Sequence, residues 1–196
     1  MDKPFSQACE NNKQPILSII SPVFSRHSHV LEIGSGTGQH AVFFAEHMPH
    51  LLWQCSDQAE YLPGINAWIE DAQLPNLAAP LELEISSPWP ITEVPAIFSA
   101  NTVHIMHWFQ VEAFFGGLKA HLQQGGDFCL YGPFNYQGDY TSESNARFDQ
   151  WLKQRDPNMG IRDSEAIAQL AESAGLTLRN DHAMPANNRL LHFHKP

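Results

Sequence analysis

The chain of 196 residues is poor in charge, and most of the charge that it carries is of one sign. Charged residues make up 16% of the sequence, with 11 Lys and Arg against 21 Asp and Glu, so the net charge is −10 when His is neutral. Such a chain lacks the basic surface that binds nucleic acids and anionic membranes. Apolar residues make up 43%, more than an intrinsically disordered chain contains. We therefore expect a folded protein with no nucleic-acid or membrane partner.

Cysteine pairs and long apolar runs are also missing. Cys9, Cys55 and Cys129 are far apart and form no C-x-x-C pair, which excludes a disulfide framework and a cysteine zinc site. No run approaches the ~18 apolar residues of a membrane span, and residues 1–13 have no signal-peptide pattern. The histidines are scattered, so no metal site is expected. The sequence predicts a soluble cytoplasmic protein and does not indicate its oligomeric state.

Short apolar runs alternate with helical patterns along the chain, which is typical of a layered α/β domain. Predicted strands cover residues 30–33, 51–55, 81–85, 96–101, 127–131, 176–182 and 189–194. Predicted helices cover residues 39–48, 59–72, 110–122 and 142–155, and one more is capped by Asp163 and ends at Gly175. The short link before the last strand predicts an antiparallel hairpin. We predict a doubly wound sheet of seven strands with helices on both faces and the last strand antiparallel.

The length fits one domain over residues 1–196, with residues 26–196 as its core. Residues 1–25 are predicted to add a helix that starts near Asn12, with Pro15 in its first turn. We expect this segment to fold over the carboxyl edge of the sheet as a lid. Asn12 then offers its amide either to the helix start or to a ligand, and Lys13 lies beside it.

The turn after the first predicted strand carries the clearest chemical signal. Gly34, Gly36 and Gly38 alternate with small residues before a predicted helix, whose backbone amides can point at a ligand. A dinucleotide site needs a third glycine where Gln39 stands, and a phosphate-binding P-loop needs Lys where His40 stands. Both of these nucleotide-binding motifs are therefore excluded.

The remaining pattern, E-x-G-x-G-x-G followed by an acid after the next strand, resembles the Rossmann-like methyltransferases that depend on S-adenosylmethionine. The resemblance implies that Glu32 orients the turn or the amino group of the cofactor, and that Ser35 and the three glycines pass under the cofactor. It also implies that Asp57, at 57 − 38 = 19 residues beyond the last glycine, accepts both ribose hydroxyls. A carboxylate has two acceptor oxygens for such a diol.

The same resemblance extends to four later residues. It implies that Gln58 flanks the adenine, that Glu84 and Ile85 meet the adenine edge, and that Asn101 lies opposite the transferred methyl group. Glu84 can equally be a solvated acid at the end of a strand. His104 follows Asn101 and is the first candidate for a general base, and Tyr131 is the second.

A narrower resemblance rests on five short segments that occur in a fixed order. They are residues 9–17, the turn 34–41, Y-G-P-F at 131–134, G-I-R-D at 160–163 and M-P-A-N-N at 184–188. Together they are similar to the family called "domain of unknown function 938". Asn11 departs from this pattern, because that family usually has Arg there. The family implies a cofactor-binding fold and no particular substrate.

Candidate acceptor contacts follow the fifth predicted strand and precede the last one. Phe134 and Tyr136 lie where open α/β sheets bind ligands, and aromatic walls suit a small-molecule pocket. Asn187 either holds a tight turn or binds a ligand. His192 and His194 are expected to be exposed.

The leading hypothesis is methyl transfer from S-adenosylmethionine to a small acceptor, neutral or cationic, of unknown identity. The alternative is a non-catalytic cofactor-binding or interaction protein that retains the fold, because a fold does not establish activity. A nucleic-acid methyltransferase is a third hypothesis, and the net charge of −10 weighs against it.

Overall fold

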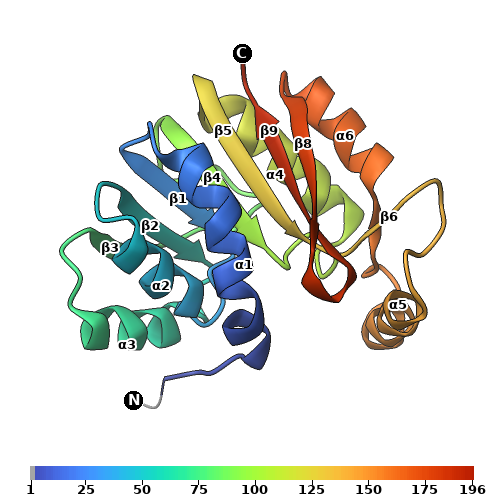
Figure 1. Cartoon of the computed structure of the whole chain (residues 1–196), viewed down its shortest axis with the longest axis horizontal. Helices are drawn as coiled ribbons and strands as arrows, with labels where there is room; N and C mark the ends of the chain where they lie inside the picture. Colours follow the sequence, from blue (N-terminus) through green and yellow to red (C-terminus); the bar gives the residue numbers. More distant parts are fainter. Residues whose placement is uncertain (1–2) are drawn as a thin grey trace.

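Seven strands form one mixed sheet in the order β3-β2-β1-β4-β5-β9-β8 (Figure 1). The structure, a computed structural model, describes residues 3–196. Strands β1 to β5 are mutually parallel, and β9 runs antiparallel to both of its neighbours. The strands are β1 (His29–Ile33), β2 (Leu52–Asp57), β3 (Leu77–Glu82), β4 (Val94–Ala100), β5 (Leu122–Gly132), β8 (Thr177–Met184) and β9 (Asn188–His194). The predicted doubly wound sheet with an antiparallel last strand is confirmed.

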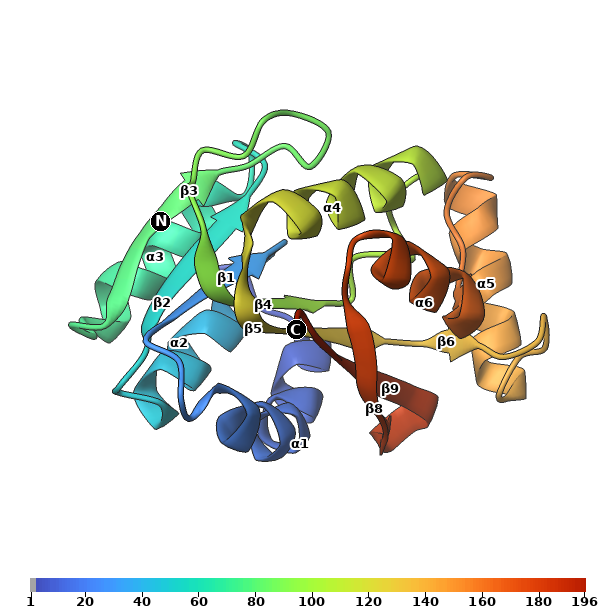
Figure 2. The same ribbon diagram turned by 90° about the horizontal axis from the view of Figure 1, so that it is seen from above.

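Helices cover both faces of the sheet (Figure 2). One face carries α1, α2 and α3, the other carries α4 and α6, and α5 lies beyond the carboxyl ends of the strands. Buried apolar side chains form one cluster on each face, as a sheet covered on both sides requires. The helices are α1 (Gln7–Phe24), α2 (Gln39–His47), α3 (Leu62–Ala72), α4 (Trp108–His121), α5 (Glu143–Arg155) and α6 (Ser164–Ser173). No helix in residues 3–196 has the length and apolar character of a membrane span.

Two strands begin well before their predicted starts. Strand β3 begins at Leu77 and not at residue 81, and it contains Pro80 beside an irregularity in its pairing with β2. An edge strand tolerates proline because one of its sides makes no ladder hydrogen bonds. Strand β5 begins at Leu122 and not at Asp127, and Gly125 and Gly126 lie within it, because both pair with the backbone of Lys195.

Helix α1 begins five residues earlier than predicted. Its cap is Ser6, whose Oγ accepts a hydrogen bond from the Cys9 amide at 3.4 Å. Asn12 is therefore an interior helix residue, and the prediction that it caps the helix is wrong. The helix continues past two internal prolines, Pro15 and Pro22. Tertiary packing stabilises it there, since one stripe of its side chains is fully buried. These side chains are Ile16, Ile20 and Phe24.

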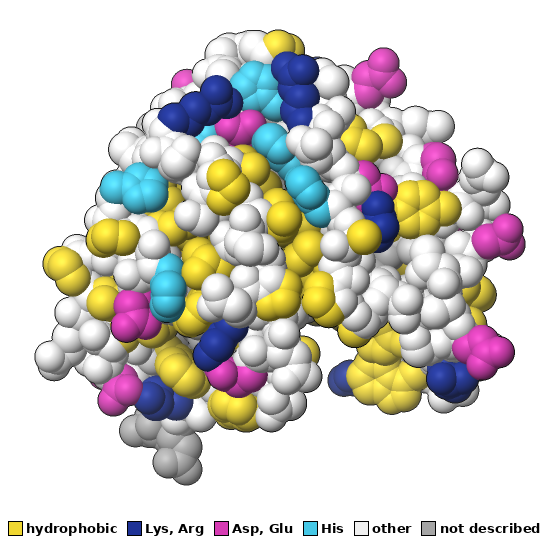
Figure 3. All heavy atoms as spheres, viewed as in Figure 1, with side chains coloured by type: hydrophobic (Ala, Val, Ile, Leu, Met, Phe, Trp, Pro, Cys, Tyr) yellow, Lys and Arg dark blue, Asp and Glu magenta, His cyan; other side chains and the backbone are white. Residues whose placement is uncertain are grey.

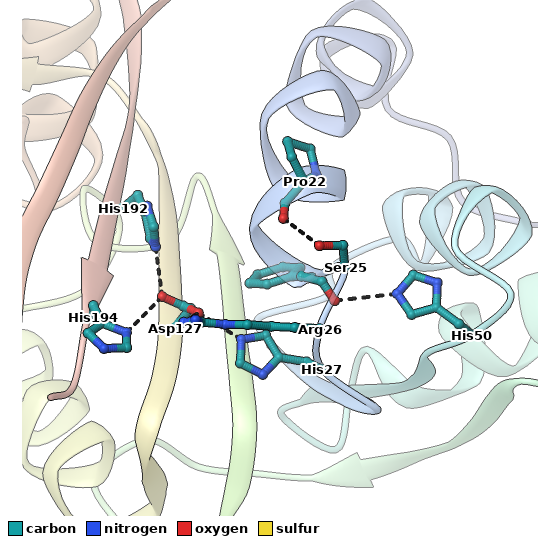
Figure 4. A network of polar contacts seen from close by, with 9 residues as sticks. Pro22, Ser25, Arg26, His27, His50, Asp127, His192 and His194 are labelled. Carbon is teal, nitrogen blue, oxygen red and sulfur yellow. Dashed lines mark hydrogen bonds and ion pairs between the residues drawn. The ribbon is translucent and has the colours of Figure 1, made fainter.

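A buried carboxylate joins the start of the first strand to the last strand (Figure 4). Asp127 on β5 accepts hydrogen bonds from Arg26 at 2.8 Å, His27 at 2.7 Å, His192 at 2.8 Å and His194 at 3.0 Å. The expectation that His192 and His194 are exposed is wrong, because both side chains point at Asp127. Burial alone would raise the pKa of Asp127, but the four donors hold it well below its ordinary value.

This depressed pKa predicts how stability depends on pH. The carboxylate stabilises the fold above its unfolded pKa of ~3.9, and this contribution is lost as the pH falls through the lower folded value. Asp127→Asn should lower the free energy of unfolding by about 3 kcal/mol near neutral pH and by less at about pH 3. Urea denaturation at both pH values tests this, with the exposed Glu143→Gln as a control that changes little. An equal loss at both pH values would contradict the assignment.

Candidate functional site

A cavity of about 980 Å³ opens at the carboxyl edge of the sheet. Its walls are α1, the Gly-rich turn after β1, the segments that follow β2, β3, β4 and β5, helix α5 and the link between β8 and β9. Figure 3 shows a notch between α1 and α5 on the same side of the molecule. Ligand pockets commonly measure ~300–1,000 Å³, so this cavity is large enough for two small ligands.

The three glycines of the turn have different surroundings. Gly36 has φ +58, and a Cβ built on it meets nothing within 4 Å, so this position opens into the cavity. A Cβ on Gly34 would lie 2.5 Å from Cγ2 of Thr102, and one on Gly38 would lie 3.2 Å from Cα of Ile65. Gly34 borders the cavity, but the contact with Thr102 is what leaves no room for a side chain there. Gly38 packs against α3 and does not border the cavity.

Glu32 lies beneath the turn and holds its shape. Its buried carboxylate accepts hydrogen bonds from Oγ of Ser35 and from Nε1 of Trp53, both at 3.0 Å. Oγ of Ser35 in turn accepts from the Ser56 amide at 3.2 Å. Burial raises the pKa of Glu32 to about 7, against the effect of these donors. Glu32 does not border the cavity, so its side chain contacts the turn and Trp53 and does not face a ligand there.

Asp57 ends β2 and binds the turn from the cavity side. Its Oδ2 accepts from the Gly36 amide at 2.7 Å, and its Oδ1 accepts from the Gln58 amide at 2.8 Å. Burial raises the pKa of Asp57, and these two hydrogen bonds oppose the rise. A carboxylate has about four acceptor positions, so two stay available to a ligand. The Gln58 side chain donates to Glu84 at 2.9 Å, and Ile85 but not Glu84 borders the cavity.

The middle of the cavity contains a strained asparagine and an unpaired histidine. Asn101 adopts a left-handed conformation, with φ +60, which is common where structure is constrained for function. His104 is 5% exposed, and its Nδ1 has no hydrogen-bond partner among the described residues. Burial, assisted by the positive charge of Arg162, lowers the pKa of His104 to about 4. The imidazole is therefore neutral at physiological pH.

Helix α1 contributes polar groups to the opposite wall, where the lid was expected. Asn12 is buried, and its Oδ1 lies 2.6 Å from Nε2 of His40. The nearby Tyr131 also borders the cavity. Burial raises the pKa of Tyr131, although the amides of Asn12 and Asn188 act in the other direction. A raised pKa makes Tyr131 a poorer proton acceptor than His104.

Four expected acceptor or lid residues lie outside the cavity. Phe134 is fully buried in the core, because β6 (Phe134–Asn135) pairs with β7 (Arg162–Asp163) and turns it inward. The Tyr136 hydroxyl donates to Asp181 at 2.6 Å. The other two are Lys13, which pairs with Glu10 at 2.5 Å, and Asn187, whose carbonyl accepts from Asn145 at 3.2 Å.

Sequence reasoning missed the wall formed by α5. Phe148, Trp151 and Arg155 border the cavity, although the sequence pattern predicted only the helix itself. The available signal was the presence of two large aromatic residues at helical spacing in an otherwise polar helix.

The family and the structural relatives of the chain agree with this fold. Over residues 3–195 the chain matches the family described as "Protein of unknown function (DUF938)". The chain belongs to this family.

Solved methyltransferases share its fold. An O-methyltransferase family protein from Burkholderia thailandensis has a TM-score of 0.84 at 16% identity, over 96% of this chain and 57% of that one. The mitomycin 7-O-methyltransferase MmcR has a TM-score of 0.85 at 12% identity, over 96% and 54%. An O-methyltransferase family 2 protein from Planctomyces limnophilus, in complex with apigenin, has a TM-score of 0.81 at 13% identity, over 96% and 60%. This DUF938 protein thus has the class I methyltransferase fold and spans little more than half of these chains.

The position of Gly36 predicts a selective loss of ligand binding. Gly36→Val places its side chain in the open cavity, so it should abolish binding of S-adenosylhomocysteine in calorimetry. Gly138→Val is the matched control, because Gly138 also has a positive φ of +81 and open space around its Cβ, but lies outside the cavity. Both variants carry similar backbone strain. Equal binding by the two folded variants would show that the turn does not hold the ligand.

The unpaired His104 predicts an unusual gain in stability. An unsatisfied buried polar group costs ~1–3 kcal/mol, so His104→Leu should raise the free energy of unfolding by about 1 kcal/mol, or Tm by ~2–4 °C. His192→Leu should do the opposite, because His192 donates to Asp127. Thermal unfolding of both variants tests this. A fall in Tm for His104→Leu would mean that the histidine is structural.

Proposed function

We propose that this DUF938 protein is a methyltransferase that transfers the methyl group of S-adenosylmethionine to a small-molecule acceptor. One observation carries the proposal: the open space above Gly36, beside the Asp57 carboxylate, is continuous with a cavity that reaches the unpaired His104. The fold that this chain shares with solved methyltransferases supports the proposal.

The residues around Gly36 fit the cofactor. Asp57 has acceptor positions for the two ribose hydroxyls, and Gly36 lets the backbone approach the ligand closely. Ile85 and Leu83 offer an apolar surface to the adenine, and Asn101 borders the same cavity. The cofactor supplies an activated methyl electrophile when it is bound.

The protein then has two tasks, which are to align the acceptor and to exclude water. The wall made by α1 separates the cavity from solvent on one side. His104, which is neutral, can accept the proton of an acceptor hydroxyl. Tyr131 is the second candidate for this role.

Cofactor binding is the first test, and it needs no knowledge of the acceptor. The protein should bind S-adenosylhomocysteine in calorimetry and should not bind NAD, because Gln39 occupies the position of the third dinucleotide-site glycine. Asp57→Ala should weaken binding at least about 100-fold, since two hydrogen bonds to a charged group are worth ~1.5–3 kcal/mol each.

Glu60→Gln is the matched control, because Glu60 is an exposed acid close to Asp57 in sequence and lies outside the cavity. It should leave the affinity unchanged. Unchanged affinity in Asp57→Ala would reject the ribose assignment, and binding of NAD would count against the proposed function. Binding without a methylated product in a small-molecule extract would favour the non-catalytic alternative.

A further inference from the structure

A row of rings leads from the centre of the cavity to its mouth along α5. The imidazole of His104 meets the Phe148 ring edge-on, with centroids 5.3 Å apart and planes at 74°. Phe148 stacks on Trp151 at 5.8 Å and 18°, and the guanidinium carbon of Arg155 lies 4.8 Å from the centre of a Trp151 ring. His104 is buried, whereas Trp151 is 47% exposed. The row therefore connects the proposed proton acceptor with a cation at the rim.

The cation at the end of this row has no partner in residues 3–196. The side chain of Arg155 makes no ion pair and no hydrogen bond there, although other charged side chains on α5 do. Lys153 pairs with Asp149 at 2.6 Å, and Arg147 pairs with Glu143 at 3.7 Å. Its charge is thus available to a ligand.

The nearest acid in the sequence is also engaged elsewhere. Asp156 accepts from His107 at 2.8 Å and from the amide of Asn158 at 2.8 Å. Arg155 instead lies over the Trp151 ring, a position that leaves the edge of a guanidinium free to bind a carboxylate through two hydrogen bonds.

Acidic side chains are missing from this half of the cavity. Among the described residues that border it, Asp57 is the one acid, and it lies at the opposite end, beside Gly36. A cationic acceptor would find no counter-charge among the residues of α5 that border the cavity, whereas an anion would find Arg155. The local charge thus differs from the net charge of −10, and it favours an anionic acceptor over the neutral or cationic one expected from the sequence. Figure 3 shows basic side chains beside hydrophobic ones on the α5 side of the notch.

We propose that the acceptor is a flat hydroxylated acid: Arg155 binds its carboxylate at the mouth, Phe148 and Trp151 stack on its ring, and its hydroxyl reaches His104. This inference rests on the proposed function and names the substrate class of the same cavity. Aromatic walls with one charged anchor suit such a ligand, since the rings contribute affinity and the ion pair fixes orientation.

The reaction that this placement allows is an O-methylation. The acceptor oxygen forms a bond to the methyl carbon while the carbon–sulfur bond breaks. The sulfur keeps the bonding electron pair and becomes a neutral thioether, and the hydroxyl proton passes to the imidazole of His104. The carboxylate at Arg155 is unchanged by the reaction.

Three phenols of different charge test the proposal: 4-hydroxycinnamate, its neutral methyl ester and the cation tyramine. Each is titrated by calorimetry into the protein with and without saturating S-adenosylhomocysteine. We expect the acid to bind at least about tenfold more tightly than the ester and the amine, as an added ion pair with hydrogen bonds predicts. Arg155→Gln should reduce this preference to about one. Arg147→Gln, a charge change on the exposed side of the same helix, should preserve it.

Trp151→Leu separates stacking from charge, because it should weaken the acid and the ester by the same factor. The proposal is overturned if the ester or the amine binds as well as the acid, if none of the three binds, or if Arg155→Gln keeps the preference. Failure of S-adenosylhomocysteine to bind would reject the proposed function instead. The titrations without it would still measure the preference for the acid, so the two failures are distinguishable.

Discussion

The hydrogen bond from the Gly36 amide to the Asp57 carboxylate, at 2.7 Å, ties the turn after β1 to the end of β2. From below, Glu32 holds the same turn through Ser35. A backbone with a positive φ keeps one geometry only when its surroundings define it. The two carboxylates therefore set the shape of the turn, and the open side of Gly36 then faces the cavity.

Two buried polar side chains, Asp127 and His104, differ in how their polar atoms are paired. Asp127 is surrounded by four donors, so its charge is compensated and it joins the beginning of β1 to β9. His104 is also buried, and its Nδ1 has no partner among residues 3–196. Buried polar groups are normally paired, and this exception occurs in a residue that borders the cavity. The first site stabilises the fold, whereas the unpaired nitrogen of the second costs stability.

Charge in this protein has to be judged locally. The chain is acidic as a whole, but at the mouth of the cavity Arg155 has no partner within residues 3–196, while the acids near it are engaged by Lys153 and His107. Exposed charges separated by more than about 8–10 Å are largely screened at physiological salt. An anchor charge within the cavity therefore contributes more to ligand selection than the net charge does.

The sequence by itself determined the fold class and the place of the Gly-rich turn at the end of β1. Alternating apolar runs, the E-x-G-x-G-x-G turn and the acid at Asp57 are local patterns, and a parallel sheet brings the ends of adjacent strands together. The ends of two elements were not determined by local sequence signals. Pro80 lies within β3, because an edge strand tolerates proline, and Asn12 lies inside α1, because packing of apolar side chains extends that helix.

Only the tertiary structure decided which side chains border the cavity on the side of α5. Phe134 and Phe148 are both aromatic residues near the carboxyl edge, but pairing of β6 with β7 buries the first in the core, whereas the position of α5 places the second in the cavity wall. The same holds for Arg155, whose unpaired state depends on ion pairs that its neighbours make. Such contacts depend on where a helix lies relative to the sheet. The periodicity of a sequence predicts which residues share one face of a helix, but not where that helix packs.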